Sequence, residues 1–255
     1  HVDPDFAART KFGRTVAHGM LLYSTLLRVV GERLPGPGTV QRSQELMFPS
    51  PTFVGERVRA QVEVIALPTP SSAELSTKIV RPDGEMGCVG KTVVTLPGND
   101  VEWPSAYRPE QYESEESYVG LTLGQKATLR KTFQRDDLSA FLKQVEDGNP
   151  IFGDIDYAQR KGFRDVLLPG GLLGGMISTL LGTRLPGRGT NWLKQSYHFL
   201  GPAYPGEEIS AKVEVVRLRP EKDLVNLRTT LSNSHGDRIV DGEALVWISD
   251  LIQSA

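Results

Sequence analysis

The residues of this sequence that could carry out acid–base chemistry fall into two groups, one near residue 1 and one in the second half of the chain. They are His1, His18 and Gly19 in the first group and Asp147, Asn149 and Gly170 in the second. A histidine and a carboxylate that are held together can position a water molecule and transfer its protons. A backbone N–H in the first turn of a helix can hold an oxygen atom on which negative charge develops, because the helix dipole favours that charge.

An internal repeat relates the two groups. Residues 18–38 read HGMLLYSTLLRVVGERLPGPG and residues 169–189 read PGGLLGGMISTLLGTRLPGRG, so that Gly19 corresponds to Gly170 at an offset of 170 − 19 = 151. Further pairs at this offset include Asp3 and Asp154, and Phe48 and Phe199. An ungapped correspondence over roughly sixty residues predicts two copies of one fold unit.

Each copy is predicted to contain a long helix followed by antiparallel strands. A Gly precedes a run of apolar residues at helical spacing, and a Leu-Pro-Gly sequence ends that run. Alternating apolar residues and turn sequences predict the strands that follow. The expected strands cover residues 57–67, 73–80 and 88–96 in the first copy and residues 208–218, 224–232 and 238–248 in the second.

The second copy also carries a segment that has no counterpart in the first. Residues 126–133 are expected to form a strand and residues 135–145 a helix, within a segment of about thirty residues. Residues 99–119 are polar and acidic, contain two prolines, and are expected to form a surface linker. We therefore expect a first repeat over 1–98 that is incomplete at its N-terminal side, a linker over 99–119 and a second repeat over 120–255. The fold class is α+β, with an antiparallel sheet wrapped around each central helix.

These motifs resemble the MaoC-like branch of the hot-dog fold, the (R)-specific enoyl-CoA hydratase family. That family has the pattern D-x-N-P-[LI]-H, an H-G pair at the start of the central helix, and a following L-P-G. Here Asp147–Ile151 reads DGNPI, His1–Pro4 reads HVDP and His18–Met20 reads HGM. The resemblance covers nearly the whole chain except the linker. It implies a double hot-dog, in which one chain contains both halves of the dimer that single-repeat relatives form.

The resemblance also implies a reaction, the reversible hydration of an enoyl-CoA-type thioester. Hydration needs a base for the water, an acid for the α-carbon and hydrogen-bond donors for the thioester oxygen. In the family, the Asp and His of D-x-N-P-x-H form the acid/base pair, and the Gly of H-G supplies the N–H. This implies His1 as acid/base, Gly19 as oxyanion donor and His18 as a residue that positions the substrate loop. The remaining candidates, Asp147, Asn149 and Gly170, would form a secondary or degenerate site.

Both copies depart from the family pattern. In the second copy, Phe152 takes the place of the His, and Pro169 precedes the helix Gly. In the first copy, the Asp would fall at 147 − 151 = −4, before residue 1. We expect the first repeat to be the active half. The abrupt start inside a motif has three explanations: a fragment, a start assigned too far downstream, or another chain that fills the gap.

Simpler interpretations remain open for each candidate. His1 could be a tag remnant, or a native residue that is idle without its Asp. Gly19 and Gly170 could serve close packing alone. Asp147 could be an ordinary turn residue. His198 and His235 are expected to be structural or solvated, and no spacing of His, Cys and carboxylates predicts a metal site.

The composition narrows the range of partners and locations. A formal net charge of -2 offers no general attraction to nucleic acid or anionic lipid. The longest apolar run, residues 20–30, is interrupted by polar residues and is too short to span a membrane. Cys88 is the single cysteine, and no signal-peptide pattern precedes the first helix, so we expect a cytoplasmic protein.

Three functions are compatible with these observations. The first is a hydratase/dehydratase that acts on an acyl-CoA or acyl-carrier thioester and needs no cofactor beyond that substrate. The second is a non-catalytic subunit that binds a thioester or supports another MaoC-like chain. The third is a hot-dog thioesterase in which Asp147 activates water. A homodimer and a complex with a second MaoC-like chain both stay open.

Overall fold

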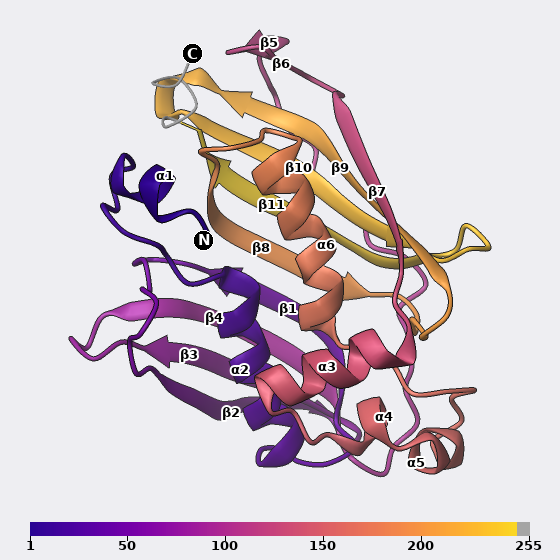
Figure 1. Ribbon diagram of the computed structural model, residues 1–255. Coiled ribbons are helices and arrows are strands. Elements are labelled where there is room, and N and C mark those ends of the chain that lie inside the picture. Colours follow the sequence, from indigo (N-terminus) through magenta and orange to yellow (C-terminus); the bar gives the residue numbers. More distant parts are fainter. Residues whose placement is uncertain (249–255) are drawn as a thin grey trace.

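The computed structural model describes residues 1–248, in which two long helices lie against one nine-stranded antiparallel sheet (Figure 1). The first half comprises α1 (Pro4–Ala8), α2 (Gly19–Glu32), β1 (Val40–Met47), β2 (Arg59–Thr69), β3 (Ser72–Val80) and β4 (Met86–Thr95). The expected strands of this half are present, with boundaries shifted by one or two residues. The sequence did not predict β1.

The second half repeats this arrangement and adds elements at its start. The linker region and the added elements are β5 (Ser117–Tyr118), β6 (Leu121–Thr122), β7 (Lys126–Thr132), α3 (Arg135–Val145), α4 (Pro150–Gly153) and α5 (Ile155–Arg160). The repeated elements are α6 (Gly170–Thr183), β8 (Asn191–Phe199), β9 (Glu208–Arg219), a short 3-10 turn (Pro220–Lys222), β10 (Leu224–Ser232) and β11 (Arg238–Trp247). The predicted strand and helix after the linker are therefore β7 and α3.

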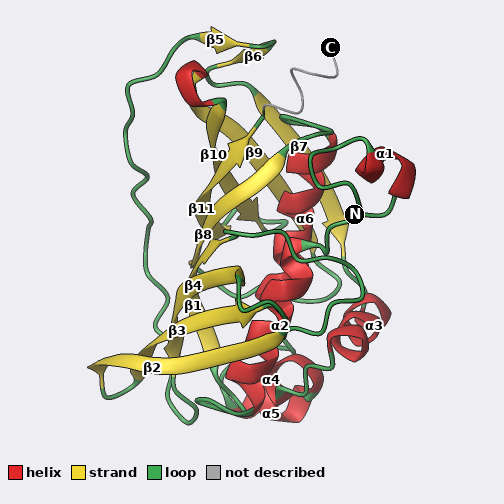
Figure 2. Ribbon diagram, turned by 90° about the vertical axis from the view of Figure 1, so that its left-hand side faces the viewer, coloured by secondary structure: helices red, strands yellow, loops and turns green. Residues whose placement is uncertain are grey.

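The two central helices are buried because they are apolar around most of their circumference. Leu22, Leu26 and Val30 of α2 are all less than 7% exposed. In α6, Ile177 and Leu180 are completely buried. The two helices pack against each other and against the same face of the sheet, so the core is continuous across both halves (Figure 2).

A pairing between β1 and β8 joins the two halves into one sheet. The strand order is β2-β3-β4-β1-β8-β11-β10-β9-β7, and Glu45 of β1 lies opposite Ser196 of β8. The sequence predicted a sheet around each helix and did not predict that the two sheets are continuous. The physical reason is that each half alone would leave an unpaired edge of N–H and C=O groups at this position.

The two outer edges of the sheet differ. In the second half, β7 pairs along β9 from Lys126 to Thr132. In the first half, β2 is the edge strand, and Ile65 and Leu67 are 45% and 67% exposed. The additional strand of the second half is therefore the one that covers its outer edge.

The linker follows the face of the sheet that points away from the helices, on the left in Figure 2. The ring of Tyr107 stacks on His198 of β8 at 4.2 Å between centroids, and Tyr112 Oη donates to Glu243 Oε1 at 2.8 Å. Within this surface segment, Val101 and Trp103 are partly buried and pack against the core, which the sequence did not predict. Burial of these apolar side chains stabilises the fold.

No helix of residues 1–248 is long and apolar enough to cross a membrane.

Candidate active site

His1, His18 and Gly19 lie together with Ser178 of α6, and we call this group the first half-site. The rings of His1 and His18 are 4.7 Å apart between centroids. His1 Nδ1 lies 2.8 Å from the carbonyl oxygen of Val16. A carbonyl only accepts, so Nδ1 must carry the proton, and in the neutral ring Nε2 then keeps its lone pair. His1 is therefore in the tautomer that a general base requires.

His18 caps the N-terminus of α2. Its Nδ1 accepts a hydrogen bond from Met20 N at 3.1 Å, which fixes the remaining proton on Nε2. His18 Nε2 is 2.9 Å from Ser178 Oγ and donates to it. Burial lowers the pKa of His18, with a smaller contribution from the positive N-terminal amine. A neutral imidazole with both nitrogens hydrogen-bonded positions the helix start and is poorly suited to carry protons. A role of His18 in positioning the substrate loop stays a prediction.

Gly19 is the first residue of α2, so its N–H is one of the amides without a partner inside the helix. A Cβ placed on Gly19 would lie 3.0 Å from Cζ of Phe48. The helix start therefore approaches Phe48 closely, and a side chain at Gly19 would force that ring to move. Both of the roles considered for this glycine, close packing and oxyanion donation, are compatible with this position.

Asp147, Asn149 and Gly170 belong to a second group of residues. We call this group, together with Phe152, the second half-site. Asn149 Oδ1 accepts from Gly38 N at 2.9 Å, and its Nδ2 donates to Thr39 O at 3.0 Å. Asn149 is 3% exposed and also caps α4, so all its polar groups are engaged in joining the second repeat to the first. Its observed contacts are structural.

Asp147 forms a turn with Asn149. Its Oδ1 accepts from Asn149 N at 3.0 Å, as the turn interpretation of the sequence expected. The side chain is 8% exposed, and burial raises the pKa of its carboxyl, although the turn hydrogen bond opposes the shift. The nearby carboxylate of Glu32 raises the pKa further. Asp147 is not among the residues that line the pocket of this half-site.

Gly170 begins α6 beside a buried hydrogen bond between two side chains of the first repeat. A Cβ on Gly170 would lie 2.6 Å from Tyr23 Oη and 2.8 Å from Phe199 Cζ. Tyr23 Oη donates to Gln41 Oε1, and Gln41 Nε2 donates to Thr92 Oγ1 at 2.9 Å. Burial raises the pKa of Tyr23 far above its usual value, so the phenol stays neutral and is a donor. The direction that a side chain at Gly170 would take is therefore occupied, although Gly170 also borders a small pocket.

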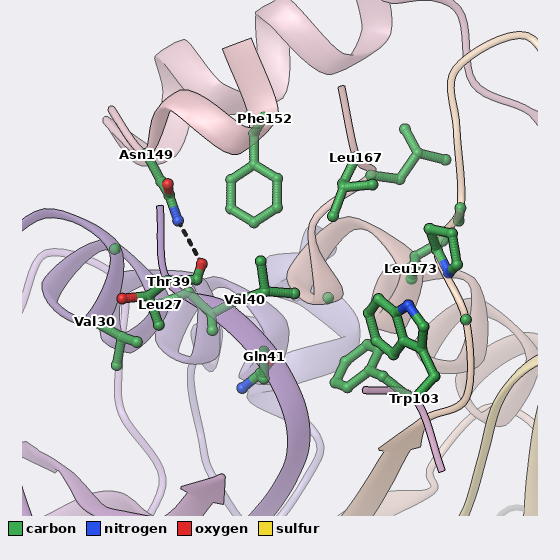
Figure 3. A pocket seen from close by; sticks show the side chains of 17 residues that line it. Leu27, Val30, Thr39, Val40, Gln41, Trp103, Asn149, Phe152, Leu167 and Leu173 are labelled. Carbon is green, nitrogen blue, oxygen red and sulfur yellow. Dashed lines mark hydrogen bonds between the residues drawn. The ribbon is translucent and has the colours of Figure 1, made fainter. Parts of the chain in front are cut away.

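A small apolar pocket lies at the second half-site (Figure 3). Its volume is about 40 Å³. Aliphatic and aromatic side chains from both repeats form much of its wall, among them Leu27, Val30, Val40, Leu167, Leu173 and Phe199. Phe152 of α4 and Trp103 of the linker enter it from different sides. The residue that replaces the family's histidine thus contributes to an apolar wall.

Several residues of these sites were not predicted from the sequence. Ser178 occupies the position of Leu27 in the repeat, since 178 − 151 = 27, and this exchange of a polar for an apolar residue is a signal that the repeat alignment contains. Tyr23 and Gln41 carry no such signal, because each lies within an ordinary helix or strand pattern. Trp103 could have been noticed as a large apolar residue in an otherwise polar linker.

The other histidines lie away from both half-sites. His198 stacks on Tyr107, and burial lowers its pKa. His235 lies in the turn between β10 and β11, where its N donates to Asn233 Oδ1. Within residues 1–248, no group of three or more His, Cys, Asp and Glu side chains could hold a metal ion.

Comparison with known proteins assigns the class of fold. A solved MaoC-like dehydratase superposes with a TM-score of 0.75 at 19% identity, covering 97% of this chain and 88% of its own. A Mycobacterium tuberculosis protein with a double hot-dog fold superposes with a TM-score of 0.73 at 13% identity, covering 96% of this chain and 86% of its own. The predicted double hot-dog architecture is confirmed.

Sequence comparison then assigns the family. Residues 1–74 match the model of the MaoC like domain, and residues 118–242 match that of the FAS1-like dehydratase domain region. An (R)-specific enoyl-CoA hydratase of Aeromonas caviae is 40% identical over 130 residues, which are 51% of this chain and 97% of that hydratase. A 3-hydroxybutyryl-CoA dehydratase of Methylorubrum extorquens is 38% identical over 132 residues, covering 51% of this chain and 83% of its own. The chain therefore belongs to the MaoC-like family of hydratases and dehydratases.

Proposed function

We propose that this chain is a hydratase/dehydratase that adds water reversibly to the double bond of an enoyl-CoA-type thioester, and that the reaction takes place at the first half-site. The enzyme class follows from the family and from relatives named as enoyl-CoA hydratase and 3-hydroxybutyryl-CoA dehydratase. The observation that carries the choice of half-site is the hydrogen bond from His1 Nδ1 to Val16 O, because it leaves Nε2 available as a base.

The proposed reaction adds the oxygen of a water molecule to the β-carbon and a proton to the α-carbon. His1 Nε2 takes a proton from the attacking water, and the electron pair of the double bond moves toward the thioester carbonyl. An acid then protonates the α-carbon. The product contains all atoms of the substrate and of one water molecule, so the reaction needs neither an oxidant nor a cofactor. The family pattern places the partner carboxylate five residues before the histidine, which corresponds to a position before residue 1.

The thioester oxygen becomes more negative during this addition and needs a donor. Gly19 N–H has that role in the proposal, because the first amides of a helix have no partner within it and the helix dipole favours negative charge there. His18 supports the arrangement by capping α2 at Met20, while Ser178 holds the far side of its ring. The first half-site is therefore built from side chains of both repeats.

The experiment follows the loss of enoyl absorbance of crotonyl-CoA with this chain and with a version that extends upstream of His1. Hydration by the extended version, with little or none by the shorter chain, would support the proposal and assign the missing carboxylate to the upstream segment. Hydration by both would place the full acid/base function within the 255 residues. Inertness of both toward short and long enoyl-CoAs would contradict the proposal and favour a binding or partner subunit.

A thiol assay on the same samples separates hydration from thioester hydrolysis. A hydratase leaves the thioester intact, so free coenzyme A should not appear while the enoyl absorbance falls. Release of thiol at the rate of substrate loss would favour the thioesterase alternative. A homodimer or a complex with a second MaoC-like chain is a further proposal, which the molecular mass of the active species in solution would test.

A further inference from the structure

The second half-site keeps the framework of an acyl pocket but has lost the room for an acyl chain. Its volume of about 40 Å³ exceeds the roughly 10–15 Å³ that one ordered water molecule needs, but it is far below the roughly 300–1,000 Å³ of an ordinary ligand pocket. The walls come from α2, β1, α4, α6 and the segment that follows β8, so they combine both repeats. A pocket of this composition is suited to an apolar ligand, provided that it has the volume to admit one.

Trp103 fills part of this pocket from outside the two repeats. It belongs to the linker, and Figure 3 shows its indole at the wall opposite to Asn149. The indole is half-buried and packs against the main core. The linker beyond it is anchored, because Tyr107 stacks on His198 and Tyr112 Oη donates to Glu243. Trp103 is thus held in place by contacts that do not involve the pocket.

The polar groups at the pocket are already paired. Asn149 is bonded to Gly38 N and Thr39 O, and Gln41 is bonded to Tyr23, Gln44 and Thr92. The ring of Phe152 takes the place that the family pattern gives to a histidine. These pairings leave the apolar walls as the surface that a ligand would meet. The chemistry of the pocket therefore matches an alkyl chain and does not match a reacting water molecule.

We propose that Trp103 is a built-in occupant of the acyl pocket of the second half-site, where its indole takes the space that the acyl chain of a thioester would fill. The choice of ligand class rests on the proposed function. As a consequence, the second half-site binds no substrate in the native chain, and the first half-site alone receives the acyl group. Removal of the indole opens a site for a straight, saturated or unsaturated acyl chain, but this site does not hydrate it.

The test is isothermal titration calorimetry of the full chain with hexanoyl-CoA, a saturated thioester that cannot be hydrated. The unsubstituted chain and Trp103→Ala are compared. The expected result is one more equivalent of hexanoyl-CoA bound per chain in Trp103→Ala. An unchanged stoichiometry in a variant that keeps the circular dichroism spectrum of the native chain would overturn the proposal.

Two matched controls locate the additional binding. Tyr118→Ala removes an aromatic side chain at the far end of the same linker, where its hydroxyl donates to Asp223, and should add no binding equivalent. Trp103→Ala combined with Leu167→Phe returns an aromatic ring to the pocket wall and should abolish the added equivalent. Added binding in Tyr118→Ala, or its persistence in the double variant, would show that the new site lies elsewhere.

If Trp103→Ala fails to fold, Trp103→Leu provides the same comparison with a smaller opening. Its midpoint of thermal unfolding should rise with hexanoyl-CoA by more than that of the unsubstituted chain, and an equal rise would overturn the proposal. Binding is independent of turnover in these experiments. An inactive chain that binds one more equivalent of hexanoyl-CoA in Trp103→Ala would support the role of Trp103 and contradict only the proposed function. An active chain that binds no additional equivalent in Trp103→Ala would contradict only the role of Trp103.

Discussion

The two half-sites have the same backbone framework and different side chains. His1 and His18 in the first correspond to Phe152 and Pro169 in the second at the repeat offset of 151. In the first, the ring of His1 lies against the ring of His18, and His18 is hydrogen-bonded to Ser178 next to the start of α2. In the second, the start of α6 is packed against the hydroxyl of Tyr23, whereas Phe199 lies there as its repeat equivalent Phe48 lies at the start of α2. Where the first half-site has two imidazole rings, the second has Phe152 and Pro169, and Phe152 forms part of an apolar wall.

The two half-sites also differ in what their polar side chains contact. One link between the two halves belongs to the second half-site, where Asn149 bonds to the turn that follows α2. The residues with a free proton acceptor belong to the first half-site, where His1 is exposed. A duplicated fold can use one site for chemistry and the other for stability, since apolar burial at the second contributes to the core.

The largest expected effect follows from removal of the proposed base. His1→Ala, made in a version of the protein that hydrates crotonyl-CoA, should lower kcat by about 10²–10⁴-fold, the usual contribution of general acid–base catalysis. His235→Ala is the matched control, because His235 lies in an exposed turn between β10 and β11. A His1→Ala enzyme with native kcat would remove the distinction between the two half-sites.

The contribution of the second half-site to stability can be measured at Asn149. Asn149→Ala leaves Gly38 N and Thr39 O without their buried partners and should lower the free energy of unfolding by about 3 kcal/mol. Urea denaturation followed by circular dichroism measures this change. Asn99→Ala removes an exposed amide at the surface and should cost no more than about 0.5 kcal/mol. Equal effects of the two substitutions would contradict the role given to Asn149.

His18 makes the first half-site sensitive to pH. Because burial lowers its pKa below the ordinary value of 6.5, the unfolded chain takes up a proton before the folded chain does as pH falls. Its contribution to stability is therefore complete above pH 6.5 and is lost below that value. His198 shifts in the same direction, so part of the dependence remains without His18.

The variant His18→Asn keeps a capping side chain and removes the titration. The free energy of unfolding, measured at intervals between pH 7.5 and about 5.5, should fall less steeply for His18→Asn than for the unsubstituted chain. Identical slopes would mean that His18 does not titrate differently in the folded and unfolded states.

Ser178 should give the smallest effect. Ser178→Ala removes the hydrogen bond from His18 Nε2 and is expected to lower the free energy of unfolding by about 1 kcal/mol. If Ser178 positions His18, the same variant should also reduce kcat for crotonyl-CoA while Ser178→Thr, which keeps a hydroxyl, restores most of it. Equal loss of kcat in Ser178→Ala and Ser178→Thr would indicate a packing role only.

Much of the fold could be predicted from the sequence because its signals are local. The Leu-Pro-Gly ends of the central helices, the alternating strands and the repeat offset determined the order of elements. The joining of the sheets through β1 and β8 could not be predicted, since it depends on a pairing between residues about 150 positions apart. The helical and strand patterns around Tyr23 and Gln41 likewise contain no sign of the hydrogen bond between them.

The candidate residues were identified more reliably than their contacts. The resemblance to the family pattern identified the six candidates, and the repeat offset led to the prediction that Phe152 and Pro169 mark the inactive half. Neither the family pattern nor the repeat could show that Trp103 lines the same pocket as Phe152, which follows it by 152 − 103 = 49 residues. The linker that carries Trp103 has no counterpart in either copy. The catalytic roles of His1 and Gly19 stay predictions, and the positions that the structure gives them are compatible with those roles.

The hydration of crotonyl-CoA by Asp147→Asn, in an active version of the protein, distinguishes the two half-sites. Asparagine keeps the oxygen that accepts from Asn149 N and removes the carboxylate from the second half-site. If the first half-site performs the reaction, kcat/KM should stay within about twofold of the unsubstituted value, since a carboxylate outside the reacting site contributes no proton transfer. A fall of about 100-fold or more would contradict the account and place the chemistry at the second half-site.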